Sequence, residues 1–244
     1  MKAERIADGV HRVLKGYVNA YVVEADEGLI LVDTGMPKKA GPIQETIRDM
    51  GRDAKDVRHI LVTHHHLDHV GSLTALVQST GATVYAPAGD AAVIRGERKP
   101  PGPNRAKVSG KTIGRVVEKI GPDQPPNDID REVGDGDVLP LAGGIRVVTS
   151  PGHTAGHTSF LLERDGGILI AGDAAGARGD KAGPPTGAIF GMFTEDLDEA
   201  VRSFHKLAKL DFEVAVTGHG NPVISGASEL FRKNLARFPL PQTG

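Results

Sequence analysis

The segment at residues 63–69 reads THHHLDH and places four possible metal ligands within six residues. His64 and His66 alternate along an extended or turning backbone, so both imidazoles can reach one ion. Asp68 and His69 begin the helix expected to follow, where they can face a second ion. Imidazole and carboxylate groups suit borderline metals such as zinc. The spacing therefore predicts a centre that holds two metal ions.

Three later positions supply further ligands, and each follows an apolar, strand-like run. His153 lies in PGHTAGH at residues 151–157, Asp173 ends GGILIAGD, and His219 lies in TGHG. Side chains at strand ends and in the loops that follow commonly form the site of layered α/β proteins. The predicted ligands form two sets that share one bridging carboxylate: His64, His66 and His153 for one metal, Asp68, His69 and His219 for the other, and Asp173 between them.

The order and spacing of these residues resemble the metallo-β-lactamase-fold hydrolases, whose HxHxDH motif is followed by a later His, Asp and His. The resemblance runs from the DTG at residues 33–35 to the GHG at 218–220. It implies an α/β chain folded as a four-layer αββα sandwich. It also implies two divalent metal ions, with zinc expected and iron or manganese as alternatives. By the same resemblance, Asp33 supports the histidine loop through hydrogen bonds without touching metal.

Several histidines near or outside these motifs are not assigned as ligands. His65 points away from its neighbours if the segment is extended. His157 belongs to the family's PGHTxGH motif but falls on the following strand. We expect His157 to orient the loop that carries the ligands, and direct ligation stays open. His11, His59 and His205 have no partner pattern and are expected to be structural.

The ligand chemistry predicts hydrolysis. Two bound metals lower the pKa of water and polarise the group that is attacked, so no protein nucleophile is required. We expect a hydroxide held between the metals to attack a small ester, lactone or thioester, with Asp68 orienting it or carrying the leaving-group proton. The alternatives are a mononuclear-iron persulfide dioxygenase, a phosphodiesterase or nuclease, a β-lactam hydrolase, and a non-catalytic binding module. The intact ligand set argues against the last.

Differences between this chain and known subfamilies reduce the number of substrate classes that we expect. β-Lactamases of this fold usually place cysteine or serine where Asp173 stands, and the chain has no cysteine. Glyoxalase II has a helical extension beyond the last ligand, whereas 25 residues (244 minus 219) follow His219 here, so glutathione thioesters are less expected. Quorum-quenching lactonases usually carry a tyrosine shortly after the bridging aspartate, where this chain has Ala174, Ala175 and Gly176.

The elements that must position the ligands alternate between strands and helices in two β-rich halves. The first half is predicted to contain strands at 10–14, 20–24, 29–32, 58–62 and 83–85, and helices at 38–50 and 69–79. The second half is predicted to contain strands at 138–139, 145–149, 158–162, 167–171 and 214–216, and helices at 197–207 and 226–236. Periodicity alone predicts only the α/β class. The two sheets with outer helices follow from the resemblance.

Composition permits this architecture as one domain over residues 1–244. With 39% hydrophobic residues and no apolar run of about 18 residues, the chain can bury a core but is not expected to span a membrane. The charged amino terminus lacks the pattern of a secretory signal, so we expect a cytoplasmic protein. The net charge of −2 gives no general attraction to nucleic acid or membranes. The expected partner is therefore a small-molecule substrate.

Two segments depart from this pattern. A proline- and glycine-rich insertion at about residues 95–130 carries eight basic and two acidic residues between positions 95 and 119. It is either an electrostatic guide for an anionic substrate or, as we favour, a solvated cap around a helix at 111–119. The second segment, residues 174–193, is glycine-rich and ends in Phe190, Met192 and Phe193. These apolar side chains are predicted to line a substrate pocket or, alternatively, to dock the loop on the core.

Overall fold

The computed structural model describes residues 2–102, 126–176 and 193–241, and the strands of these ranges form two sheets. The first has seven strands in chain order: β1 (Glu4–Ala7), β2 (Val10–Leu14), β3 (Ala20–Ala25), β4 (Gly28–Val32), β5 (Val57–Leu61), β6 (Thr83–Pro87) and β7 (Arg131–Val133). The second has five strands, in the order β12 (Val214–Val216), β11 (Ile168–Ile170), β10 (Thr158–Leu162), β9 (Ile145–Thr149) and β8 (Val138–Leu139).

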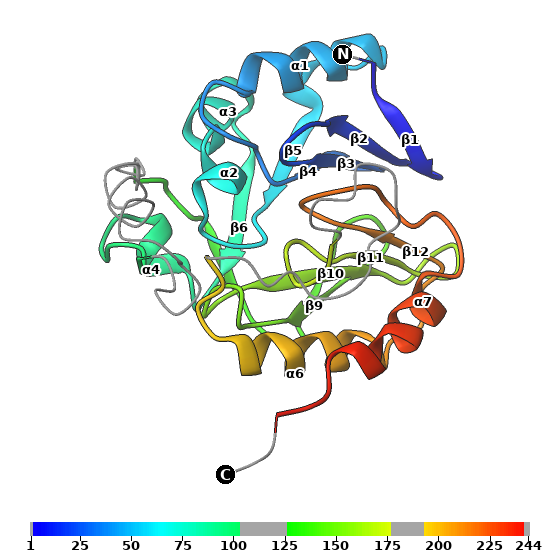
Figure 1. Ribbon diagram of the computed structural model, residues 1–244. Helices are drawn as coiled ribbons and strands as arrows, with labels where there is room; N and C mark the ends of the chain where they lie inside the picture. Colours follow the sequence, from blue (N-terminus) through cyan, green and yellow to red (C-terminus); the bar gives the residue numbers. More distant parts are fainter. Residues whose placement is uncertain (1, 103–125, 177–192, 242–244) are drawn as a thin grey trace.

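Helices cover the outer faces of both sheets, which gives four layers (Figure 1). α1 (Ala40–Asp49) and α3 (Leu73–Thr80) lie over the first sheet, whereas α6 (Leu197–Leu207) and α7 (Ala227–Asn234) lie over the second. This is the αββα sandwich that the family resemblance implied.

An apolar cluster lies between each pair of neighbouring layers. The outer cluster of the first sheet packs Ile43 and Ile47 of α1 against strand residues such as Leu31. The middle cluster joins the facing sides of the two sheets. The third packs the phenylalanines of α6 and α7 against the second sheet. Because each strand alternates its side chains between two faces, a sheet with apolar layers on both sides needs nearly continuous apolar strands. Ile168–Ile170 and Val214–Val216 are such strands, buried at every position.

Strand direction brings the ends of several strands to one place. β4, β5 and β6 run parallel in the first sheet, and β11 and β12 run parallel in the second. Asp33 follows β4, the THHHLDH segment follows β5, Asp173 follows β11, and His219 follows β12. The metal-binding motifs therefore lie beyond strand ends, where loops can point side chains into a shared site.

The predicted helix at 69–79 is wrong in one respect. The structure divides this region into α2 (Leu67–Val70), which contains Asp68 and His69, and α3, which begins at Leu73. Ser72 explains the break, because its hydroxyl donates to the carbonyl of Met36 and accepts from the amide of Lys39. A side chain that bonds to distant backbone in this way replaces the continuing helical ladder.

Four other short elements were not predicted, namely β1, β7, α4 (Ala91–Ile94) and the 3₁₀ helix Ala54–Asp56. The terminal helix is also shorter than predicted: α7 ends at Asn234 and gives way to a 3₁₀ turn, Leu235–Arg237. The predicted helix at 111–119 lies outside the described residues. Among the residues that are described, no helix has the length and apolar character needed to cross a membrane.

Candidate metal centre

Three imidazole nitrogens meet where the first sheet faces the second. His66 Nδ1 lies 3.1 Å from His64 Nε2 and 3.0 Å from His153 Nε2. Zinc ligands at 2.0–2.1 Å in a tetrahedral site stand roughly 3.3–3.4 Å apart, so this spacing is close to what one cation requires. The three residues come from different halves of the chain, and His66 and His153 are 87 positions apart. They form the three-histidine set.

A hydrogen-bonded relay fixes which nitrogen of His64 faces the site. Asp33 accepts the Thr63 amide at 2.9 Å and the Thr63 hydroxyl at 2.8 Å. His64 Nδ1 lies 3.0 Å from the same hydroxyl, which can accept its proton while donating to Asp33. Nε2 of His64 is therefore unprotonated, and its lone pair is available to bind a metal. Asp33 adopts a positive φ of 59°, which aspartate tolerates better than most residues.

The second set lies beside the first. His219 Nε2 lies 3.3 Å from an oxygen of Asp68, and His69 Nε2 lies 3.9 Å from that oxygen. Nδ1 of His69 donates to Asp33 at 2.8 Å, and Nδ1 of His219 donates to the carbonyl of Tyr17. Each histidine thus turns its Nε2 towards the site. We refer to Asp68, His69 and His219 as the second set.

Asp173 lies between the two sets, and its position differs in detail from the expected bridge of one oxygen per metal. Its Oδ2 is 3.3 Å from His153 Nε2 and 3.2 Å from His219 Nε2, whereas Oδ1 is 3.5 Å from His69 Nε2. One oxygen therefore faces a histidine of each set, and the other faces His69 of the second set.

Burial sets the charge state of the three-histidine set. Burial and the neighbouring imidazoles lower the pKa of His64 and His66 well below the ordinary value. Burial also lowers the pKa of His153, although Asp173 works against this effect. These imidazoles are therefore neutral near pH 7, which is the form that binds a metal.

The second set has the opposite balance. Burial disfavours its charged histidines, but the nearby carboxylates outweigh burial and raise the pKa of His69 to about 9 and that of His219 to about 11. Burial likewise disfavours a charged Asp68, but His69 and His219 lower its pKa to about 2. In the metal-free protein this set holds two cationic imidazoles against ionised carboxylates. A divalent cation would replace those two protons with equal charge.

The donor set fits metal ions. His64, His66 and His153 form one group of ligand atoms that all lie within 4.8 Å of one another, and Asp68, His69 and His219 form another. Within the described part of the chain, His69 Nε2 and Asp173 Oδ1 are buried and have no hydrogen-bond partner. Buried polar atoms normally have partners. A metal ion bound at the second set would supply a partner to both atoms.

The histidines outside the two sets have other contacts. His157 accepts the amide of Asp173 at Nε2 and pairs with Ser150 at Nδ1, so it holds the backbone of Asp173. His65 is buried, with Nδ1 3.0 Å from a carboxylate oxygen of Asp90 and Nε2 3.8 Å from Glu195. Its ring lies 4.9 Å from that of His66, but it belongs to neither group of ligand atoms.

Sequence reasoning missed three residues that contact the ligands or their loops. Asp90 is fully buried and bonds to the loops that carry His64, His66 and His153. Asn19 bonds to the turn that carries His219. Tyr17 is 73% exposed and its ring lies 5.1 Å from that of His219. None of them belongs to a spaced motif, so the sequence offered no signal for them beyond the polar side chains themselves.

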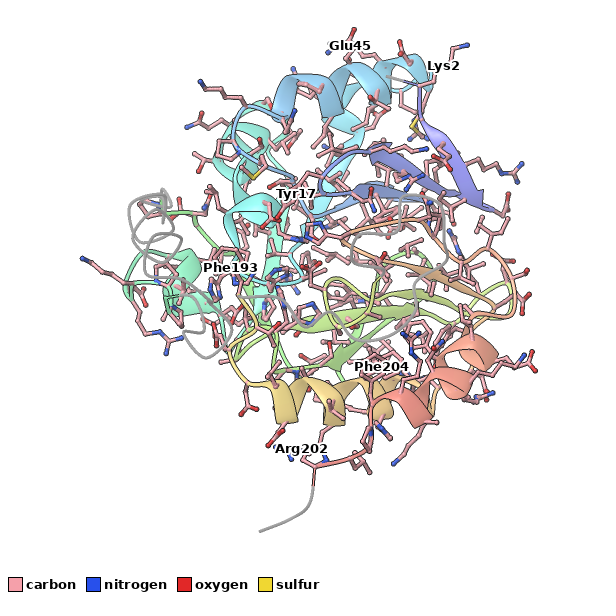
Figure 2. The ribbon with its side chains drawn as sticks, in the orientation of Figure 1. Lys2, Tyr17, Glu45, Phe193, Arg202 and Phe204 are labelled. Carbon is pink, nitrogen blue, oxygen red and sulfur yellow. The ribbon has the colours of Figure 1, made fainter. Side chains whose placement is uncertain are left out.

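Of the three residues predicted to line a substrate pocket, the structure describes Phe193. Phe190 and Met192 lie outside the described residues, so their predicted role stays a prediction. Phe193 is 44% exposed, and its ring centroid lies 6.0 Å from that of His66. Figure 2 shows Phe193 in the segment that leads into α6 and Tyr17 in the loop between β2 and β3. Each of these aromatic side chains contacts a histidine of a different set.

Comparisons with known proteins identify the family and the fold of this chain. A model of the metallo-beta-lactamase superfamily matches residues 13–219. The chain is 28% identical to the probable metallo-hydrolase YflN of Bacillus subtilis, over 95% of this chain and 90% of that protein. A hydroxyacylglutathione hydrolase of Methylococcus capsulatus is 33% identical over 74% of this chain, although the match covers 53% of that enzyme. The crystal structure of the metallo-beta-lactamase GOB-18 from Elizabethkingia meningoseptica superposes with a TM-score of 0.73 at 23% identity, covering 98% of this chain and 89% of that one. At that identity the superposition shows a common fold.

Proposed function

Because the chain belongs to the metallo-β-lactamase superfamily, we propose that it is a metal-dependent hydrolase of a small ester, lactone or thioester. The observation that supports this most is the pairing of two ligand sets around Asp173, whose Oδ2 lies within 3.3 Å of a histidine from each. We propose two zinc ions as the resident cofactor. When bound, they would activate a water and polarise the carbonyl that it attacks.

Asp68 is the residue best placed to handle a proton. Its pKa of about 2, which His69 and His219 hold down against the effect of burial, keeps it ionised at neutral pH. Its side chain is only 18% exposed, so it faces the site more than solvent. An ionised carboxylate there can accept a hydrogen bond from the attacking water and orient it. As the water attacks, Asp68 can take up the proton that the water loses and pass that proton to the leaving group.

Asp33 and His157 keep the ligands in place without touching substrate. Asp33 holds His69 by a charge-assisted hydrogen bond, and His157 holds the backbone of Asp173. Such outer contacts fix ring orientation and raise the basicity of the ligand.

The surroundings of the site favour acyl substrates with an apolar portion. Tyr17 and Phe193 each expose an aromatic ring beside a ligand histidine. Aromatic side chains at a site give apolar contact area at low entropic cost. The name of the relative from Methylococcus capsulatus specifies hydroxyacylglutathione. Because an acylglutathione is a thioester, this relative supports a thioester as the substrate class.

A substrate panel tests the proposal. The zinc-loaded protein is assayed with lactones, aryl esters, thioesters, β-lactams and phosphodiesters at equal concentration. We expect the acyl substrates with apolar groups to have the highest kcat/KM, and we expect Phe193→Ala to raise their KM more than it changes kcat. The exposed Phe193 can be truncated without opening the core.

Three other outcomes of the same substrate panel would contradict the proposed function. Preferred phosphodiester turnover that is lost on neutralising Lys107 and Lys111 would favour the nuclease alternative and assign the basic insertion to substrate binding. Preferred β-lactam turnover would assign the chain to antibiotic hydrolysis. No turnover of any substrate by a fully metal-loaded protein would favour a binding module.

A further inference from the structure

The metal ligands are divided between the two sheets, so something must fix the distance across the gap. His64, His66, Asp68 and His69 follow β5 of the first sheet, whereas His153, Asp173 and His219 follow β9, β11 and β12 of the second. Apolar packing between the sheets sets their separation only loosely, because it is not directional. Ligand atoms must be placed within about 0.5 Å for a metal site to be selective.

A single carboxylate links the loops around the three-histidine set. Asp90 follows β6 of the first sheet and is fully buried. Its Oδ2 accepts the amide of His65 at 2.9 Å and the hydroxyl of Thr154 at 2.7 Å, and its Oδ1 accepts the amide of Gly156 at 2.7 Å. His65 lies between two metal ligands, and Thr154 follows a third. Asp90 thus bonds to both loops whose nitrogen atoms must converge.

The backbone at this joint is too close for side chains. A Cβ on Gly89 would lie 2.7 Å from the Cα of Gly156, and a Cβ on Gly156 would collide with the backbone nitrogen of Asp90. The two loops therefore meet glycine against glycine, and the carboxylate of Asp90 spans the contact. This explains why glycine stands at both positions.

An amide makes the corresponding link at the second set. Asn19 precedes β3 of the first sheet and is 2% exposed. Its Nδ2 donates to the carbonyl of Thr217 at 3.0 Å and to that of Gly220 at 2.9 Å, which lie on either side of His219 in sequence. Its backbone amide donates to the carbonyl of Gly218 at 2.7 Å. Asn19 therefore bonds to three backbone carbonyls around His219, and Tyr21 and Arg12 donate to two of the same carbonyls.

We propose that Asp90 and Asn19 are positioning residues, one for each metal: Asp90 sets the geometry of the three-histidine set, and Asn19 sets that of the second set. The proposal rests on metal binding at both sets, as in the proposed function, but it does not depend on which substrate is hydrolysed. Its test therefore reads metal affinity and not turnover.

The test uses two proteins that each keep one complete set. His219→Ala retains the three-histidine set, and His153→Ala retains the second set. Zinc affinity of each purified, metal-free protein is measured by competition with a chromophoric chelator. Asp90→Asn or Asn19→Leu is then added to each background, so the coupling between positions is read as in a double-mutant cycle.

We expect a crossed pattern. Asp90→Asn should weaken zinc binding by roughly 10–100-fold in the His219→Ala protein, which is the effect typical of residues that support metal ligands. It should change the affinity of the His153→Ala protein by less than about twofold. Asn19→Leu should do the reverse. A general loosening of the fold would not give opposite effects in the two backgrounds.

Folding is controlled for at both positions. After Asn19→Leu, the carbonyls of Thr217 and Gly220 keep Tyr21 and Arg12 as donors. If Asp90→Asn does not fold, Thr154→Val takes its place, because this change removes only one of the hydrogen bonds that Asp90 accepts. Thr154→Ser retains the hydroxyl that makes this bond and should retain the zinc affinity that Thr154→Val loses.

Two substitutions of the same kind serve as matched controls. Asp130→Asn changes a carboxylate that accepts the amide of Val84 in β6, and Asn234→Leu changes a buried amide in α7 that donates to Leu230. Neither residue contacts a ligand loop, so neither should alter zinc affinity. Equal losses in both backgrounds, or no loss in either, would overturn the proposal. Absence of zinc binding by the His153→Ala protein would overturn the assignment of Asn19.

Discussion

His157 accepts a hydrogen bond from the backbone amide of Asp173, with Nε2 2.9 Å from that nitrogen. Burial lowers the pKa of His157 to about 3, so its ring is neutral. Nδ1 then carries the proton and donates it to the Ser150 hydroxyl at 2.9 Å. Both ring nitrogens are used in placing the carboxylate of Asp173, and neither is free to bind a metal.

Replacement of His157 should therefore act through Asp173. His157→Phe keeps an aromatic ring but removes both bonds, and we expect turnover to fall roughly 10–100-fold while zinc remains at the three-histidine set. Ser150→Ala, which removes only the outer bond, should have a smaller effect. Metal content and kcat measured on the same preparations decide the matter. If His157→Phe loses zinc as completely as His153→Ala, His157 is itself a ligand.

Asp173→Asn should separate folding from catalysis. Asparagine keeps the shape of the side chain but loses the charge that faces His153 and His219. The variant should fold, keep at least part of the zinc at the three-histidine set, and lose most turnover because the second metal is held poorly. Asp173→Ala should be worse. Circular dichroism, zinc counts and ester hydrolysis test this, and wild-type turnover in Asp173→Asn would refute the shared role.

Asp33 should contribute to stability as well as to metal binding. It is 3% exposed and accepts bonds from Thr63 and His69. Asp33→Ala should cost about 3 kcal/mol of unfolding free energy, because charge-assisted bonds are lost and buried donors are left without acceptors. Asp165→Ala is the matched control, since Asp165 has a similar positive φ of 52° on the surface. Equal losses in urea unfolding would assign the cost to backbone strain alone.

Filling the two sets should release different numbers of protons. The histidines of the three-histidine set are neutral near pH 7, because burial lowers their pKa. His69 and His219, with pKa values of about 9 and about 11, carry protons that a metal must displace. Between pH 6 and 8, zinc affinity of the His153→Ala protein should thus rise on the order of 100-fold per pH unit, since about two protons leave.

The His219→Ala protein is the comparison for this effect, and its zinc affinity should change little over the same range of pH. Calorimetry in buffers of different ionisation enthalpy counts the protons directly. Release of the same number of protons by both proteins would contradict the charge states described for the two sets.

The fold could be predicted where apolar runs are buried on both faces and the chain turns sharply. β9, β10 and β12 have the predicted bounds because apolar residues make up most of each strand and most of their positions are buried. β1 (ERIA) and β7 (REV) were missed because they are edge strands with mostly polar or exposed residues. The break between α2 and α3 depends on the contact of Ser72 with Met36, a pair 36 residues apart.

The candidate ligands could be recognised because metal chemistry imposes residue type and local spacing on residues 64–69. The residues that hold the ligand loops obey no such spacing. Asp90 is hydrogen-bonded to Thr154, which is 64 positions away in the sequence, and Asn19 to Thr217, which is 198 positions away. Almost any polar side chain could make such contacts if the fold brought it to the right place. Only the tertiary structure identifies which one does.

The central claim is that two metal ions act together in hydrolysis, and metal content measured against activity tests it most directly. Protein purified without added metal is analysed for zinc, iron and manganese, and each fraction is assayed with a small ester or thioester. We predict that turnover reaches its maximum at two zinc ions per chain and that His153→Ala and His219→Ala each lower both values. One iron per chain with full activity in His219→Ala would contradict the account and favour oxygen chemistry at the three-histidine set.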